Sequence, residues 1–296
     1  MPRSIPAFGS AELGPFGVAA FATRRPRPAI AAMLSRPAGL LGVALFLVTL
    51  IAAVFAPWLG TTDPFALSGA PLMAPNGAHW MGTDALGRDV WSGVLYGARA
   101  SLFVGAAVGL VAFAFGTAIG MVAGYRPGVM DAALMRVTEL FQVVPRFFFV
   151  AVVLALFGPG LDRLILTLGL TSWPLLARVV RGEVIVMRQL EFVRAAEALG
   201  ASERYILVHE LLPNVLPGAL VLVGGIVGQA MLIEASLGFL GLGDPSVLTW
   251  GVLVAQAQGF LRVAWWLALF PGLAILIAVF AFNLLADAFS AASFGG

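Results

Sequence analysis

Long apolar runs, each of about 20 residues, are the feature that most restricts how this chain can fold. At about 1.5 Å per residue, a helix of that length crosses the hydrocarbon of a bilayer. Hydrophobic residues make up 60% of the chain, and the mean hydropathy is +0.99, far above that of a soluble domain. Because a backbone in lipid must satisfy its own hydrogen bonds, we predict an all-α membrane protein.

Six transmembrane spans are predicted, and Pro145 divides the third into a more polar first half and an apolar second half. The spans cover residues 40–59, 102–125, 130–157, 161–180, 215–237 and 265–288. The domain division that follows is a tail at 1–36, a first transmembrane helix at 37–59, an extracytoplasmic loop at 60–100, a five-helix core at 101–290, and a C-terminal tail at 291–296. An even number of spans places both termini on one side of the membrane.

Arginine counting sets the orientation, because arginine is retained on the cytoplasmic side of a membrane. All 17 basic residues are arginines. With the N-terminal tail inside, twelve lie in inner segments, the outer segments hold only Arg88, Arg99, Arg163 and Arg262, and Arg146 beside the Pro145 kink belongs to neither group. We therefore expect both termini in the cytoplasm. The arginines form no basic stripe, which argues against a nucleic-acid partner.

Several chemistries are excluded or disfavoured by composition. A chain without Cys has no thiol catalysis, and His79 and His209 are too far apart in sequence to suggest a metal site. A chain without Lys has no P-loop, so it cannot bind ATP through one. Residues 241–244 read GLGD, as in intramembrane aspartyl proteases, but no Tyr-Asp pair accompanies them. We interpret Asp244, which precedes Pro245, as a turn residue, and we expect no catalytic, cofactor-binding or metal-binding residues.

A charged stretch between the fourth and fifth spans predicts an elbow of two short helices on the cytoplasmic side. Its first helix has an apolar ridge at helical spacing, made of Phe192, Ala195, Ala196 and Leu199. The opposite face of that helix carries Glu191, Arg194 and Glu197. We expect Gly200 to end this helix in a left-handed conformation, and Ser202 to cap a second helix that ends before Leu212-Pro213.

The elbow is predicted to contact a protein. Between residues 178 and 210 the chain has five Glu and five Arg, whereas an anchor for anionic lipid would be mainly basic. An apolar ridge that projects from the membrane suits insertion into a cleft on a soluble partner.

The spacing of Ala195-Ala196, Gly200 and Leu212-Pro213 resembles the EAA loop of permease subunits of ABC importers, which docks on the ATPase subunit. Here Arg194 replaces the usual Glu, and Glu210 replaces the usual Ile before Leu-Pro. The resemblance implies that residues 188–213 are this loop. It assigns ATPase coupling to Glu191, Phe192, Arg194, Ala195, Ala196, Glu197, Leu199, Gly200, Ala201, Ser202, Leu212 and Pro213.

Three further segments resemble the dipeptide, oligopeptide and nickel type of permease. They are HWMGTDALGRDVWSGVLYGARASL at 79–102, EASLGFLGLG at 234–243, and WWLALFPGLAILIAVFAFNLLADAF at 265–289. The resemblance implies a type I importer permease in the inner membrane of a prokaryote, paired with a second, related permease. It also implies two ATPase subunits that bind ATP and Mg, and an extracytoplasmic binding protein. The cargo stays open among dipeptides, oligopeptides, glutathione-like solutes, opines and nickel chelates.

Charges at membrane depth make Glu139 and Glu234 candidates for the translocation pathway, together with Arg146 beside the Pro145 kink. An interhelical or intersubunit ion pair is the alternative for each. Glu234 on the pathway would receive a cationic group of the cargo. The broken third span also permits an ATP-independent secondary transporter or channel, although such a protein has no use for the elbow.

The outer loop around residues 84–96 begins an apolar face at helical spacing, made of Val90, Trp91, Val94, Leu95 and Ala98. We expect an amphipathic helix on the outer membrane face, near the docking region of the binding protein that the resemblance implies; a structural plug against the bundle is the alternative. The second span carries small residues on one face, which predicts close helix packing. They are Gly105, Gly109, Gly116, Gly120 and Gly124.

Overall fold

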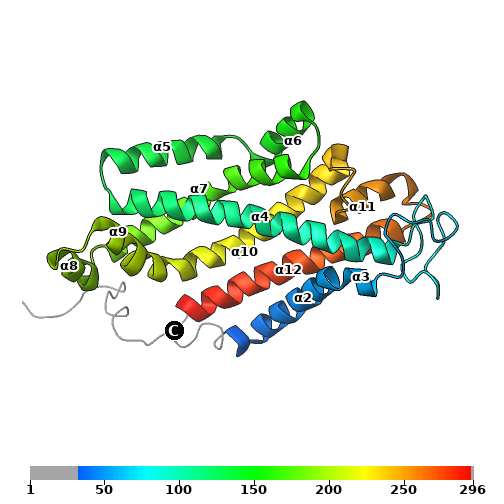
Figure 1. The fold of residues 1–296 in the computed structure, drawn as a ribbon, viewed down its shortest axis with the longest axis horizontal. Helices are drawn as coiled ribbons and strands as arrows, with labels where there is room; N and C mark the ends of the chain where they lie inside the picture. Colours follow the sequence, from blue (N-terminus) through cyan, green and yellow to red (C-terminus); the bar gives the residue numbers. More distant parts are fainter. Residues whose placement is uncertain (1–32, 295–296) are drawn as a thin grey trace, which may run out of the picture.

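A bundle of long helices makes up the described part of the chain, residues 33–294 of a computed structural model (Figure 1). Five helices there are long and apolar enough to cross a membrane, and a helix pair bent by 73° makes a sixth span if it is counted as one. The all-α prediction is confirmed. The N-terminal tail predicted at 1–36 lies almost wholly outside the described residues.

The long helices are α2 (Pro37–Val54), α4 (Val90–Tyr125), α7 (Leu161–Met187), α10 (Leu212–Leu237) and α12 (Trp266–Phe294). The bent pair consists of α5 (Val129–Val143) and α6 (Arg146–Phe157). The short elements are α3 (Ala56–Leu59), α8 (Glu191–Ala198), α9 (Glu203–Tyr205), the π-helical turns η2 (Ile206–Leu211) and η3 (Gly238–Leu242), α11 (Trp250–Ala257) and the 3-10 turn η4 (Gln258–Phe260).

The predicted glycine face of α4 packs closely against two helices: Gly105 and Gly109 face α10, and the last three glycines face α7. A Cβ on Gly120 would lie 2.6 Å from the carbonyl oxygen of Ala177 and 2.7 Å from the Cβ of Val180. Gly116 and Gly124 face α7 in the same way, one turn before and after. Because the partner residues rise in number along both helices, α4 and α7 run parallel. The chain between them, α5 and α6, must therefore return across the bundle, which supports counting this pair as one broken span.

Helix α4 begins at Val90, well before the predicted start of the second span. Asp89 caps it, since its carboxylate accepts a hydrogen bond from the Ser92 backbone N–H at 2.9 Å. The amphipathic helix expected in the outer loop is thus the first part of α4. The predicted boundary between the loop at 60–100 and the core at 101–290 therefore falls inside α4. Val90 and Val94 are buried in one cluster with Trp266 of α12. The apolar face packs against protein and not on the membrane surface, which agrees with the structural alternative.

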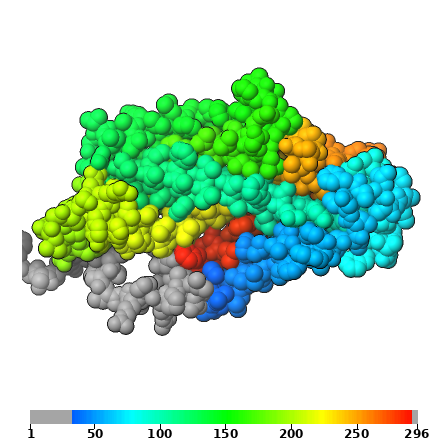
Figure 2. All heavy atoms as spheres, in the orientation of Figure 1, coloured from blue at the N-terminus to red at the C-terminus, as the bar shows by residue number. Residues whose placement is uncertain are grey.

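The bundle has two distinct ends (Figures 1 and 2). At one end the elbow of α8 and α9 projects beyond the points where α2 begins and α12 ends. At the opposite end lie the loop of residues 60–89, α3 and α11. Helix α11, which the sequence reading did not identify, follows a cap in which Thr249 Oγ1 accepts from the Val252 backbone N–H at 3.2 Å.

Candidate functional site: the elbow and the polar groups within the membrane

The elbow has the glycine joint that its sequence predicts. Helix α8 ends at Ala198, and Gly200 adopts a φ of +82°, the left-handed region that favours glycine. The Gly200 N–H donates to the Glu197 carbonyl and the Ala201 N–H to the Ala196 carbonyl, both at 3.0 Å. This bonding pattern is the Schellman motif, which satisfies the last carbonyls of the helix. The left-handed conformation of Gly200 and these two backbone hydrogen bonds therefore fix the bend after α8.

Three of the four residues of the predicted apolar ridge, Phe192, Ala195 and Leu199, are exposed. Leu199 is 89% exposed and Phe192 is 40% exposed, whereas Val193, which lies between the ridge positions, is fully buried. Val193 holds α8 against the core cluster that includes Ile206 and Leu211. Val193 and the half-buried Ala196 thus hold α8 against the bundle, whereas Phe192, Ala195 and Leu199 of the predicted ridge remain exposed for contact.

The second helix of the elbow begins as predicted but does not end before Leu212-Pro213. Ser202 Oγ accepts a hydrogen bond from the Tyr205 N–H at 3.3 Å. From Glu203 the helix then runs on through the turn η2 into α10, as one continuous segment up to Leu242. Pro213 has no N–H to donate, and the wide π-helical turn before it adjusts the bonding without a break. The second arm of the elbow is consequently continuous with α10, whereas α8 is separated from it by the joint at Gly200.

Polar contacts tie the elbow to the end of α4. Arg126 donates two hydrogen bonds to the carboxylate of Glu203, at 2.5 and 2.8 Å. The Tyr125 hydroxyl donates to Glu197 at 3.2 Å, and Arg188 donates to the Tyr125 carbonyl at 2.9 Å. A single exposed ion pair contributes little to stability, but a bidentate pair fixes the orientation of its two side chains relative to each other. These contacts join residues 63 to 77 positions apart, and the sequence pattern gave no signal for them.

The predicted membrane-depth residues do not form one cluster. Glu139 on α5 is exposed and pairs with Arg136 of the same helix at 3.0 Å. Arg146, the residue after Pro145, reaches across to α7 and α10. Glu234 is only 3% exposed, and its carboxylate accepts a hydrogen bond from the Thr249 hydroxyl at 2.6 Å. The Glu234 side chain therefore faces the start of α11.

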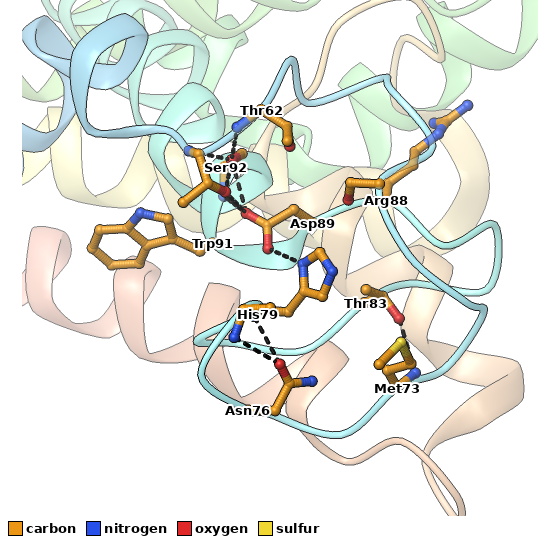
Figure 3. Close-up of polar contacts among 12 residues, drawn as sticks. Thr62, Met73, Asn76, His79, Thr83, Arg88, Asp89, Trp91 and Ser92 are labelled. Carbon is orange, nitrogen blue, oxygen red and sulfur yellow. Dashed lines mark hydrogen bonds and ion pairs between the residues drawn. The ribbon is translucent and has the colours of Figure 1, made fainter.

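A network of hydrogen bonds shapes the loop at the opposite end (Figure 3). Asp89 contacts His79 Nδ1 at 3.0 Å and accepts hydrogen bonds from the hydroxyls of Ser92 at 2.8 Å and Thr61 at 2.9 Å. Burial by itself would raise the pKa of Asp89, but the hydrogen bonds from Ser92, His79 and Thr61 outweigh it and hold this pKa below its ordinary value. The loop is thus a folded cap that its own polar groups hold together.

Asp244 is a turn residue, as predicted. Its carboxylate accepts hydrogen bonds from the Ser246 N–H at 2.9 Å and the Ser246 hydroxyl at 2.6 Å. The hydroxyl bond is the main cause of a lowered pKa for Asp244. A carboxyl held ionised in a turn does not suit an acid that must share a proton with a second carboxyl, as in aspartyl proteases.

Comparisons with known proteins agree on one family. Residues 116–293 match the family described as the inner membrane component of binding-protein-dependent transport systems. The chain is 36% identical to a probable D,D-dipeptide transport system permease protein, DdpC, of Escherichia coli, over 82% of each chain. It is 39% identical to a putative peptide transport system permease protein of Brucella suis, over 83% of this chain and 84% of the other.

A dipeptide transport system permease protein, DppC, of Alkalihalophilus pseudofirmus is 35% identical, over 83% of this chain and 82% of the other. Among solved structures, an inward-facing conformation of the MetNI methionine ABC transporter matches with a TM-score of 0.55 and 19% identity. That match covers 66% of this chain and 93% of the other, and at this identity it shows a shared fold.

Proposed function

Because the chain belongs to the family of inner membrane components of binding-protein-dependent transport systems, we propose that its elbow transmits the work of ATPase subunits to the membrane helices. The chain is a permease subunit of an ABC importer and not an enzyme, and the family works with ATPase and binding-protein subunits. ATP and Mg would bind on the ATPase subunits, and this chain would hold no cofactor.

The cargo that we propose is a peptide, from dipeptides to short oligopeptides. Three of the relatives above are named for peptide or dipeptide transport, and a further one, from Pectobacterium atrosepticum, for glutathione. We also propose a heterodimer with a second, related permease, in a prokaryotic inner membrane. The arginine distribution supports cytoplasmic termini and places the elbow on the same side.

The observation that carries the coupling proposal is the exposed ridge on a rigid, anchored helix. Leu199 is too exposed to gain free energy from burial within this chain, but it would be buried in a groove of a partner. The second arm of the elbow is continuous with α10 and is tied to the end of α4 by the pair of Arg126 and Glu203. A displacement of α8 would therefore reach both central helices, and ATP binding would shift the population between inward-open and outward-open bundles.

The residues that the sequence predicts at membrane depth, Glu139, Pro145, Arg146 and Glu234, are proposed to lie along or near the translocation pathway. Support comes from the polar residues that are exposed on α5 and α10, including Glu139, Gln142 and Gln229. Such groups are costly against lipid, so we expect this side of the bundle to face the pathway and the second permease.

The test of coupling is a pull-down of the ATPase subunits by the tagged permease. Leu199→Glu should abolish their retention and the ATP-dependent uptake of radiolabelled alanyl-alanine, because it places a charge in the docking contact. The matched control is Val129→Glu, an equally exposed apolar residue (87%) on α5 outside the elbow, which should leave both unchanged. Equal retention in the two variants, or uptake by this chain without an ATPase, would favour a secondary transporter or channel instead.

A further inference from the structure

Arg146 is a cation without a counter-ion in the part of the chain that the structure describes. Its guanidinium donates to the Gln229 side-chain carbonyl at 3.0 Å and to the Ser172 hydroxyl at 3.4 Å. Across residues 33–294, the salt bridges, taken within 4.0 Å, do not include Arg146. A guanidinium has five N–H donors, so three remain beyond these two neutral partners.

Measured along the helix axes, the Arg146 site lies far from both ends of the bundle. Ser172 is about 16 Å from the Leu161 end of α7 and farther from the other end, at 1.5 Å per residue. Gln229 is likewise at least about 12 Å from either end of α10. An uncompensated charge at such a depth is costly in lipid and usually marks a route for ions or solutes.

The surroundings of Arg146 favour an open, polar surface over a lipid contact. Gln229 is itself exposed, and Ser236, two turns further along α10 on the same face, is exposed as well. A Cβ on Gly225, one turn earlier on that face, would meet no atom within 4 Å. Arg146 and the exposed Gln229 thus lie at a surface with free space along α10, and the buried Ser172 hydroxyl of α7 supports the guanidinium from behind.

We propose that Arg146, positioned by Gln229 and Ser172, binds a carboxylate of the cargo as it passes through the membrane. This inference rests on the proposed function, since it places the cation on the pathway of an importer for peptides. A guanidinium matches a carboxylate through two parallel hydrogen bonds, and every peptide with a free C-terminus carries one. The neutral partners leave the positive charge available, whereas a carboxylate partner within the chain would cancel it.

The test restores the charge chemically. Because the chain has no Cys, Arg146→Cys gives it a single thiol, which reacts with aminoethyl methanethiosulfonate to add a cation or with methyl methanethiosulfonate to add a neutral group. Uptake of radiolabelled alanyl-alanine is measured in vesicles that contain the complete transporter. The unsubstituted transporter, treated with the same reagents, controls for cysteines of the other subunits.

We expect Arg146→Cys to assemble normally and to lower uptake about tenfold or more, as for the loss of a charged hydrogen bond. The cationic reagent should restore uptake, the neutral one should not, and excess alanyl-alanine should slow the labelling. Normal uptake by the variant, restoration by the neutral reagent, labelling at an unchanged rate, or loss of the second permease would each overturn the proposal. The last outcome would identify Arg146 as an intersubunit contact. If the unsubstituted transporter fails to import the dipeptide, the proposed function itself is wrong.

Discussion

The packing of α4 on α7 predicts that Gly120→Ala destabilises the bundle, although alanine is the better helix former. Ordinary contact of a Cβ begins near 3.4 Å, but a methyl group at Gly120 would lie 2.6 Å from the Ala177 carbonyl oxygen and 2.7 Å from the Val180 Cβ. Neither neighbour is the end of a flexible side chain. Helix α7 would have to move by roughly 0.7–0.8 Å, as in the overpacking of a filled core.

The expected size follows from two opposing effects. Overpacking costs about 1–3 kcal/mol, and replacing a helical Gly by Ala returns about 0.5–1 kcal/mol. We expect a net loss of up to about 2.5 kcal/mol for Gly120→Ala, and a deficit of about 1–3 kcal/mol relative to a Gly→Ala change without overpacking. Gly225→Ala is the matched control, because no atom lies within 4 Å of its Cβ position, and it should be neutral or slightly stabilising.

The free energy of unfolding would be measured on the purified chain in mild detergent, by titration with sodium dodecyl sulfate and far-ultraviolet circular dichroism. The Gly120→Ala transition should occur at a clearly lower denaturant fraction than that of Gly225→Ala. Coincident transitions would refute the close packing of α4 on α7, and with it the argument that α5 and α6 form one crossing.

Other contacts give further predictions, each measured by the same unfolding assay. Asp89→Ala should cost about 1–3 kcal/mol, since it removes a helix cap and buried hydrogen bonds. Because the pKa of Asp89 is lowered in the folded state, its contribution to folding stability is fully present above the ordinary pKa of 3.8 and is lost as the pH falls through the folded pKa. Asp89→Ala should therefore lose less stability than the unsubstituted chain as the pH falls through this range. Glu234→Gln, which keeps the acceptor for Thr249, should change stability by less than about 1 kcal/mol, and normal uptake by this variant would remove Glu234 from the pathway. Val193→Ala, at a fully buried position, should cost about 1–3 kcal/mol and make α8 more sensitive to protease in the folded subunit.

Much of the fold could be predicted because lipid imposes simple rules on sequence. A run of apolar residues must become a helix, so the six spans follow from length and composition. The same holds for Gly200 and Ser202, whose roles depend on backbone conformation within a few residues. Pro145 marks the break between α5 and α6 for an equally local reason.

Other features depend on partners that are distant in sequence. The apolar face from Val90 to Ala98 has the same spacing whether it meets lipid or protein, and only the position of α11 and α12 decides between them. The anchoring of the elbow by Tyr125 and Arg126 joins segments that no local pattern connects. The burial of Glu234 against Thr249 likewise depends on α11, whose capped apolar run was overlooked.

The most direct test of the account asks on which side of the membrane the elbow lies and what covers it. Leu199→Cys would place a single thiol at the most exposed point of the ridge, in a chain that otherwise has none. We predict no reaction with a membrane-impermeant maleimide in spheroplasts, rapid reaction in inverted vesicles stripped of ATPase, and protection when the ATPase subunits are added back. Labelling from the outside, or labelling in inverted vesicles that the ATPase does not slow, would contradict the account.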